Sequence, residues 1–453
     1  MEKAFPPCFK AYDIRGKVPE ELDNALAEKI GRGLVHIFGV RKVVIGRDVR
    51  PSGVGLVDAL SRGLQGSGCD VLLLGLCGTE EIYHAAFSKE KDGVDGGVVV
   101  TASHNPAEYN GMKIVLRGAR PLSGDSGLKD LARYVVTEEP QRVSPALGRL
   151  SECSLKNDYI DHLLSYIDGE QLSPLKIVAN CGNGCAGPVL DLLEKKLPFS
   201  FYRLHDAPDG TFPNGVPNPL LPQNREETAQ AVLHQGADVG IAWDGDFDRC
   251  FFWDEKGSFV EGYYLVGLLA HEMLRRNPGE KILHDPRLVW NTIDLVKKCG
   301  GVPVMTKTGH AFIKERMRLE DALYGGEMSA HHYFKDFGFC DSGMIPWLLV
   351  TAVLSRTRKP LSALVSDMVA AYPVSGEINS TVEDADKVLA KIEQLYTDGE
   401  KEYTDGLSVM YEDFRFNIRK SNTEPLLRLN VESRGDVRLL REKTAELLRQ
   451  IRE

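Results

Sequence analysis

Apolar and polar residues follow two different periods along the chain. Short apolar runs at 42–46, 71–76, 96–100 and 176–180 predict buried strands. The stretches 20–38 and 54–64 instead carry apolar residues at helical spacing, which predicts amphipathic helices. Because strands and helices alternate, we expect an α/β protein with mostly parallel sheets.

The pattern repeats weakly and then changes. Apolar strands that end in Gly, Asp or Pro turns begin at 43, 177 and 282, and the polar stretch 138–154 predicts a linker. Beyond residue 370 the chain becomes strongly charged, with helices expected at 384–395 and 437–451 around alternating, strand-like segments. We therefore predict three similar mixed α/β domains and a smaller C-terminal α+β domain, with boundaries at 1–147, 148–252, 253–370 and 371–453.

Length, charge and cysteine content limit the possible classes of protein. A chain of 453 residues is too long for one core. The net charge of −10 argues against a nucleic-acid or anionic-membrane partner. The 9 cysteines form no zinc-binding pattern, so we expect reduced thiols in a cytoplasmic protein. The N-terminus lacks a signal-peptide pattern, and no apolar stretch reaches the ~18 residues of a spanning helix.

A polar loop, 101–106, follows the apolar run 96–100. It brings Ser103, His104 and Asn105 to the carboxyl end of a predicted strand, where open α/β sheets bind ligands. Ser103 and His104 alone are ambiguous, because a nucleophile is recognised by its activating partners and adjacent residues seldom point at each other. Lys113, in the next apolar run, either extends to the surface or returns to this loop. Arg15 follows a predicted short strand that ends in a Gly turn, where a solvated arginine is the simpler interpretation.

Three carboxylates follow another predicted strand. Asp244, Asp246 and Asp248 occupy alternate positions, and in extended backbone alternate side chains share a face. Three acids on one face repel one another unless a cation lies between them, and oxygen ligands suit Mg²⁺ or Ca²⁺. An EF-hand loop starting at Asp244 is the main alternative. It would place Arg249 where glycine is needed and would follow a strand instead of a helix.

Polar residues also collect at three later strand ends and in the last hairpin. The strand ends offer Arg287, Lys307, His310, Glu327, Ser329 and His331. Each alone is an ordinary surface group, but together they suit an anionic ligand with many hydroxyls. The loop 419–425, dense in hydroxyl and basic groups, is either an oxyanion cradle or a plain hairpin turn.

Four ordered motifs, 101–106, 244–249, 326–331 and 419–425, together resemble those of the α-D-phosphohexomutase superfamily. Within it the chain looks most like bacterial phosphomannomutases, and the strings 9–16, 78–83 and 285–287 have that appearance as well. Ala330 departs from the pattern, because many relatives carry glycine there. The resemblance implies four domains around a central cleft.

The resemblance also implies a role for each candidate residue. Ser103 would be carried as phosphoserine, and one Mg²⁺ per subunit would be held by Asp244, Asp246, Asp248 and a phosphoryl oxygen on Ser103. Arg15 and Lys113 would flank the transferring group, with His104 beside them and His331 as a candidate general acid/base. The substrate-binding set would be Tyr12, Arg249, Arg287, Lys307, His310, Glu327, Ser329, Arg419, Ser421, Asn422 and Thr423.

The implied reaction is the reversible interconversion of mannose 6-phosphate and mannose 1-phosphate. It would pass through a hexose 1,6-bisphosphate, which also acts as activator, and would supply GDP-mannose. The partners would be sugar phosphates, and the protein a monomer or weak dimer. Three alternatives stay open: a dual-specificity phosphomannomutase/phosphoglucomutase, a Ca²⁺-binding interaction protein built on 244–255, and a Ser103/His104 hydrolase. The last lacks a Gly-x-Ser-x-Gly elbow.

Overall fold

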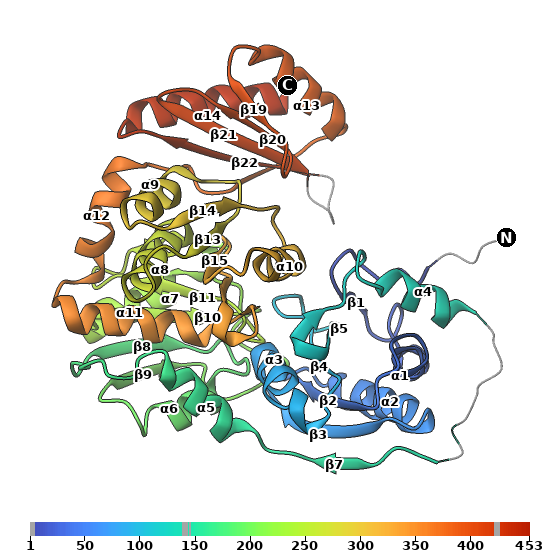
Figure 1. Cartoon of the computed structure of the whole chain (residues 1–453). Coiled ribbons are helices and arrows are strands. Elements are labelled where there is room, and N and C mark those ends of the chain that lie inside the picture. Colours follow the sequence, from blue (N-terminus) through green and yellow to red (C-terminus); the bar gives the residue numbers. More distant parts are fainter. Residues whose placement is uncertain (1–4, 138–143, 145, 421–425) are drawn as a thin grey trace. The chain divides into compact units, whose positions relative to one another are not determined.

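The computed structural model describes residues 5–137, 144, 146–420 and 426–453 (Figure 1). It divides into two units. Unit 1 comprises Met1–Phe259 and Tyr333–Arg358, and unit 2 comprises Val260–His332 and Lys359–Glu453. Each unit is described by itself.

The first sheet of unit 1 has the order β1-β5-β4-β2-β3-β7, and β6 pairs with β5. β2 runs parallel to β3 and β4, whereas β5 is antiparallel to β4 and β1, so the sheet is mixed. Its strands are β1 (Ile14–Lys17), β2 (Lys42–Arg47), β3 (Asp70–Leu76), β4 (Gly96–Val100), β5 (Tyr109–Leu116), β6 (Arg120–Pro121) and β7 (Leu150–Glu152). Its helices are α1 (Asn24–Phe38), α2 (Gly53–Gly66), α3 (Thr79–Ser88) and α4 (Leu128–Val136). Apolar side chains of β2 and β4 pack with those of α1, α2 and α4 in one core.

The second sheet of unit 1 has the order β12-β11-β10-β8-β9. β8 runs parallel to β9 and β10, and β11 returns antiparallel to β10. The strands are β8 (Lys176–Asn180), β9 (Ser200–Leu204), β10 (Val239–Trp243), β11 (Cys250–Trp253) and β12 (Phe259–Val260). The helices are α5 (Lys156–Ser165), α6 (Gly187–Leu193) and α7 (Glu226–Gln235). Unit 1 also holds most of β16 (His332–Phe334), with β17 (Cys340–Asp341) and α11 (Met344–Thr357). The Trp243 indole donates to the Gly343 carbonyl at 2.9 Å, which fixes α11 against β10.

Unit 2 contains an α/β part and an antiparallel part. In the α/β part, β13 (Lys281–His284) runs parallel to β14 (Val302–Met305) and β15 (Tyr324–Gly326). Its helices are α8 (Gly262–Arg276), α9 (Trp290–Lys298), α10 (His310–Glu320) and α12 (Leu361–Ala371). The last sheet has the order β18-β22-β21-β20-β19. It comprises β18 (Ile378–Thr381), β19 (Glu400–Glu402), β20 (Leu407–Met410), β21 (Phe414–Lys420) and β22 (Leu426–Ser433), with α13 (Ala385–Leu395) and α14 (Val437–Arg452) over a separate core.

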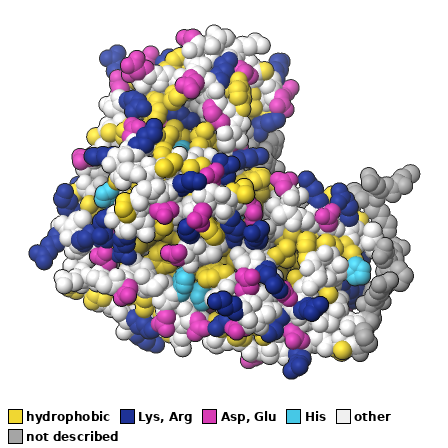
Figure 2. All heavy atoms as spheres, viewed as in Figure 1, with side chains coloured by type: hydrophobic (Ala, Val, Ile, Leu, Met, Phe, Trp, Pro, Cys, Tyr) yellow, Lys and Arg dark blue, Asp and Glu magenta, His cyan; other side chains and the backbone are white. Residues whose placement is uncertain are grey.

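The predicted fold class is confirmed: three mixed α/β regions precede an antiparallel α+β region. The predicted boundaries stay a prediction. The first helix begins at Asn24, because the Asp23 side chain caps it by accepting from the Leu26 amide. Among the described residues, no helix is long and apolar enough to cross a bilayer. On the visible face in Figure 2, basic and acidic side chains are interspersed.

One local prediction was wrong, and another was incomplete. Arg15 and Gly16 do not form a turn but lie within β1, paired with β5. Gly16 serves close packing, since a Cβ there would lie 2.8 Å from the Glu21 Cβ. The predicted linker also contains a strand, Leu150–Glu152, which pairs with β3. All three of its residues are exposed, so no apolar alternation marked it. Residues 138–143 and 145 of that linker lie outside the described residues.

Candidate functional site

The serine loop joins β4 to β5 in a tight, buried turn. Ser103 has φ 50°, in the left-handed region, and is 3% exposed. Its amide donates to Thr101 Oγ1 at 2.9 Å. This backbone turn brings Ser103 Oγ to 3.0 Å from His104 Nδ1. The expectation that neighbouring side chains would not meet was therefore wrong, because it assumed an ordinary backbone.

The acidic loop joins β10 to β11 and is also a turn. The Phe247 amide donates to the Asp244 carbonyl at 3.1 Å, and Phe247 has φ 46°. The assumption of extended backbone was therefore wrong, yet the carboxylates of Asp244, Asp246 and Asp248 still converge within 4.8 Å of one another. Strands flank this loop on both sides, whereas an EF-hand needs helices.

The two loops meet inside unit 1. Ser103 Oγ donates to Asp244 Oδ2 at 2.6 Å. Arg249 Nη2 donates to the same carboxylate oxygen at 2.6 Å and lies 3.3 Å from Ser103 Oγ. Lys113 returns to the loops: its Nζ donates to Asp246 at 2.7 Å and also contacts Asp248. A hydroxyl thus sits between carboxylates and two buried cations, an arrangement that can accommodate a phosphoryl group on Ser103.

Burial and charge set the protonation of this cluster. Burial raises the pKa of Asp244 to about 6 against the opposing charge of Arg249. Burial and Asp248 act the same way on Asp246, but the charge and hydrogen bond of Lys113 hold its pKa below the usual value. Burial and then Arg249 hold the pKa of His104 well below its usual value, so this imidazole is neutral near pH 7.

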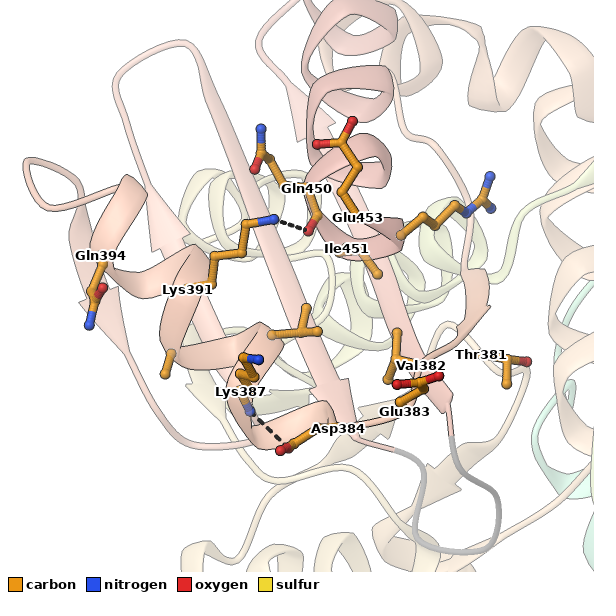
Figure 3. Close-up of a pocket in the computed structure, with 13 residues that line it drawn as sticks. Thr381, Val382, Glu383, Asp384, Lys387, Lys391, Gln394, Gln450, Ile451 and Glu453 are labelled. Atoms are coloured by element: carbon orange, nitrogen blue, oxygen red, sulfur yellow. Dashed lines mark hydrogen bonds between the residues drawn. The ribbon is translucent and has the colours of Figure 1, made fainter.

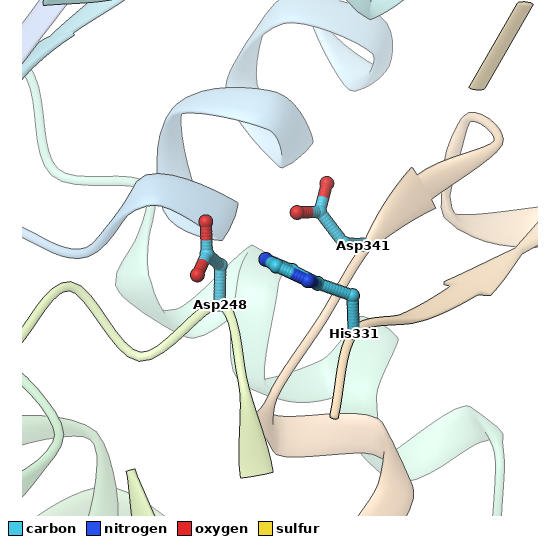
Figure 4. Close-up of side chains that lie close together, drawn as sticks. All are labelled: Asp248, His331 and Asp341. Atoms are coloured by element: carbon cyan, nitrogen blue, oxygen red, sulfur yellow. The ribbon is translucent and has the colours of Figure 1, made fainter. Parts of the chain in front are cut away.

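The acid cluster has the chemistry of a site for a hard cation. Asp246 is fully buried, and its Oδ1 accepts no hydrogen bond from any described residue. A buried carboxylate oxygen without a donor is costly unless a cation compensates it. Asp341 of β17 adds a fourth carboxylate, with an oxygen within 4.8 Å of one on Asp248 (Figure 4). These oxygens suit Mg²⁺.

Residues outside the two loops also shape the cluster. Thr79, at the start of α3, donates from Oγ1 to Asp246 Oδ2 at 2.6 Å. Arg15 Nη1 donates to the Asn105 side chain at 2.8 Å, which ties β1 to the serine loop. Tyr12 is half-buried in the segment before β1. The structure therefore brings Arg15, Ser103, His104 and Lys113 into one region with the acidic loop.

The predicted sugar loop of unit 2 is a tight turn after β15. The Ala330 amide donates to the Glu327 carbonyl at 3.0 Å, and Ala330 has φ 71°. The left-handed conformation explains why glycine would also suit this position. Arg287 Nη2 lies 3.4 Å from Glu327 and 3.3 Å from Ser329, and His331 Nδ1 lies 3.4 Å from Glu327.

Two predicted residues of unit 2, Arg287 and Arg419, lie beside a carboxylate that the sequence did not single out. Glu377, which precedes β18, lies 3.1 Å from Arg419, 3.1 Å from Arg428 and 3.6 Å from Arg287. Burial raises the pKa of Glu377, but the three guanidinium groups outweigh burial and hold that pKa below its usual value. Lys307 is exposed, with its Nζ 4.8 Å from the centre of the Phe312 ring, and His310 begins α10. Ser421, Asn422 and Thr423 lie outside the described residues.

A separate cavity of about 740 Å³ lies within the last domain, between α13 and the end of α14 (Figure 3). Lys387, Lys391 and Arg452 line it together with Glu383 and Asp384. Among the described residues, none of the predicted site residues lines this cavity, so it is distinct from the described residue sets above.

Comparison with known proteins identifies the family. Profiles of the phosphoglucomutase/phosphomannomutase family match along the chain: alpha/beta/alpha domain I at 7–141, domain II at 157–257, domain III at 261–372 and the C-terminal domain at 377–449. The chain is 56% identical over 449 residues to a phosphomannomutase of Salmonella typhimurium LT2, covering 97% of this chain and 98% of that one. It is 55% identical, with the same coverage, to a phosphomannomutase of Escherichia coli K12.

Solved structures agree with this assignment. The crystal structure of a phosphoglucomutase/phosphomannomutase family protein from Burkholderia thailandensis has a TM-score of 0.87 and 33% identity, covering 98% of this chain and 96% of that one. A structure from Thermus thermophilus, with a TM-score of 0.80 at 23% identity, covers 99% of this chain and all of its own and supports the fold alone. The chain therefore belongs to the phosphoglucomutase/phosphomannomutase family of the α-D-phosphohexomutases and is a phosphoryl-transferring mutase.

Proposed function

We propose that this enzyme is a phosphomannomutase that interconverts mannose 6-phosphate and mannose 1-phosphate through a phosphoserine at Ser103. The observation that supports this most directly is the 2.6 Å contact between Ser103 Oγ and Asp244, with Lys113 and Arg249 held at the same cluster. Phosphoryl transfer depends on positioning and charge stabilisation, and this cluster offers both. The choice of mannose rests on relatives of 52–56% identity that are named phosphomannomutases.

The reaction has two halves. The phosphoryl group on Ser103 passes to the hexose phosphate, which gives a hexose 1,6-bisphosphate and leaves the serine as a hydroxyl. The bisphosphate then turns over, and its other phosphate returns to Ser103. The same bisphosphate, supplied from outside, would act as activator by loading the serine.

Residues of unit 1 handle the transferring group. The side chains of Lys113, Arg249 and Arg15 neutralise charge on the phosphoryl oxygens as the bond to Ser103 breaks. Asp244, Asp246 and Asp248 would hold one Mg²⁺ together with an oxygen of the phosphoserine. When bound, that ion supplies a Lewis acid and offsets the repulsion among the carboxylates. His104 is half-buried and neutral, so it orients the serine without adding charge.

Residues of unit 2 would bind the sugar and its second phosphate. Glu327 and Ser329 present oxygens to sugar hydroxyls, and Arg287 orients both of them. Arg419, with Ser421, Asn422 and Thr423, would hold the phosphate that is not reacting, and Lys307 and His310 would complete the contacts of unit 2. Tyr12 of unit 1 is also a proposed substrate contact. His331 is the candidate general acid/base. The mannose 1-phosphate formed would feed GDP-mannose synthesis.

Two measurements test this proposal. Wild-type enzyme should show a larger kcat/KM for mannose 1-phosphate than for glucose 1-phosphate, with Mg²⁺ and a trace of hexose 1,6-bisphosphate present. Near-equal values would indicate a dual-specificity mutase and refute the choice of mannose. Incubation with the bisphosphate should add about 80 Da, one HPO₃ group, to the intact mass. Ser103→Ala should lose both turnover and the added mass, and retained turnover would refute the phosphoserine.

A further inference from the structure

Arg50 is a buried arginine that no motif singled out. It follows β2, the strand beside β4 in the first sheet, and its side chain is 0% exposed. An arginine side chain has five N–H donors, and all five are used here. Nε donates to Asp48 Oδ2 at 3.1 Å, and the other four reach the backbone carbonyls of Ser103 (3.0 Å), Asn105 (2.6 Å), Pro106 (2.5 Å) and Tyr109 (2.9 Å).

Asp48 completes a second connection to the same loop. Its Oδ1 accepts the Arg50 amide at 2.9 Å, and its Oδ2 accepts the Thr101 hydroxyl at 2.7 Å. The Thr101 oxygen in turn accepts the Ser103 amide. Arg50 thus fixes the carbonyl of Ser103, and Asp48 fixes its amide through Thr101. The two sides of this one residue are held from the same point after β2.

A loop of the second domain in unit 1 covers Arg50. The centre of the Phe212 ring lies 5.1 Å from the Arg50 Cζ, within cation–π range. Gly210 lies against the backbone, because a Cβ there would come within 2.2 Å of the Val49 carbonyl. This close approach excludes water from the guanidinium. The hydrogen bonds of Arg50 therefore have no solvent competitor, and a lost partner cannot be replaced by water.

We propose that Arg50 is a positioning residue for phosphoryl transfer, which holds Ser103 in its left-handed conformation and so directs Oγ toward Asp244. This inference rests on the proposed role of Ser103. A non-glycine residue with φ near 50° persists only where its surroundings over-determine it, and the contacts of Arg50 and Asp48 supply that constraint. Among the described residues, Arg50 hydrogen-bonds none of the predicted substrate-binding residues, so its effect should fall on turnover and not on substrate binding.

The test is Arg50→Lys, which keeps the charge but offers at most three donors to five acceptors. A misplacement near 1 Å lowers rates by about 100-fold, so we expect kcat for mannose 1-phosphate to fall on that order while KM stays within about threefold. Hydrogen–deuterium exchange of the full-length protein should show faster exchange over residues 101–111 and unchanged exchange in β20–β22. Arg50→Met should lower kcat and speed up exchange over residues 101–111 at least as much as Arg50→Lys does.

Arg62→Met is the matched control, because the exposed Arg62 pairs with Glu28 alone among the described residues, at 3.5 Å in the same domain. It should match wild type in kcat and in loop exchange. The proposal would be overturned if residues 101–111 of Arg50→Lys exchanged at the same rate as in the wild type. A rise in KM with unchanged kcat would also overturn it. Faster exchange throughout the protein would assign Arg50 to general stability and also overturn it. Absence of turnover in the wild type would refute the proposed function instead, and the exchange experiment would still decide the role of Arg50.

Discussion

Replacing Lys113 by methionine should lower the free energy of unfolding, because the carboxylates of the acidic loop then repel one another with less compensation. Lys113 is 7% exposed, and its Nζ contacts Asp246 and Asp248. Three carboxylates of this loop are balanced by two cations, Lys113 and Arg249, and the variant leaves one. Removing one partner of a buried ion pair costs about 3–5 kcal/mol, because the remaining charge is buried without compensation. Methionine keeps most of the volume of the lysine side chain, so the loss of stability reports the removal of its charge.

The assay is urea unfolding followed by tryptophan fluorescence. Three of the four tryptophans, Trp243, Trp253 and Trp347, are buried in unit 1, so most of the signal reports the unit that contains the substitution, while Trp290 reports unit 2. A loss of this size shifts the unfolding midpoint by on the order of 1 M urea. The loss should be larger at pH 8 than at pH 5, because carboxylates without the lysine take up protons at low pH. Millimolar Mg²⁺ should reduce the loss at pH 8.

Lys129→Met is the matched control. Lys129 is exposed and lies 3.7 Å from Asp125, and such surface pairs contribute about 0–1 kcal/mol. Equal losses in the two variants would refute the electrostatic reasoning. A loss in Lys113→Met that is the same at pH 5 and pH 8 would refute it as well, since packing alone does not depend on pH.

Two further predictions concern unit 1. Thr79→Val removes the hydroxyl that donates to Asp246, and Mg²⁺ affinity measured by calorimetry should fall about 10–100-fold. The matched Thr137→Val, whose exposed hydroxyl donates to the Tyr134 carbonyl at 2.7 Å, should leave that affinity unchanged, and equal effects would contradict the reasoning. Burial, with a contribution from His162, lowers the pKa of His84 to about 4. The unfolded chain takes up this proton near pH 6.5, so lowering the pH from 7 to 4 should destabilise wild type relative to His84→Phe by about 3 kcal/mol, and a pH-independent difference would count against it.

Candidate site residues could be predicted from the sequence where a polar loop follows a buried strand. Ser103 comes after β4 and Asp244 after β10, and apolar runs marked both strands. The carboxyl ends of such strands are where α/β folds bind ligands, so their polar loops were predictable. The local backbone was not predictable, because the left-handed conformations at Ser103 and Phe247 are imposed by tertiary contacts.

The roles of residues whose partners are far away in the sequence could not be predicted. Thr79 and Asp246 are 167 positions apart, and nothing about an isolated threonine at a helix start indicates that pair. Arg50 follows β2, but nothing in the sequence indicated that its side chain has five acceptors in the serine loop and at Asp48. Glu377 stands in a charged region where one more acid carries no signal. These roles exist only once the folded chain brings the partners together.

The carboxylate of Glu377 changes what phosphate binding would mean in unit 2. Arg419, Arg428 and Arg287 already have an anion among them, so an arriving phosphate would exchange partners and would not find bare cations. The affinity gained would be a difference between two sets of ion pairs, smaller than either. Under the proposed reaction, a bisphosphate that must dissociate, rotate and bind again would benefit from such weak binding, because its dwell time in either orientation would be short. Glu377 would thus act as an internal counter-ion that speeds release.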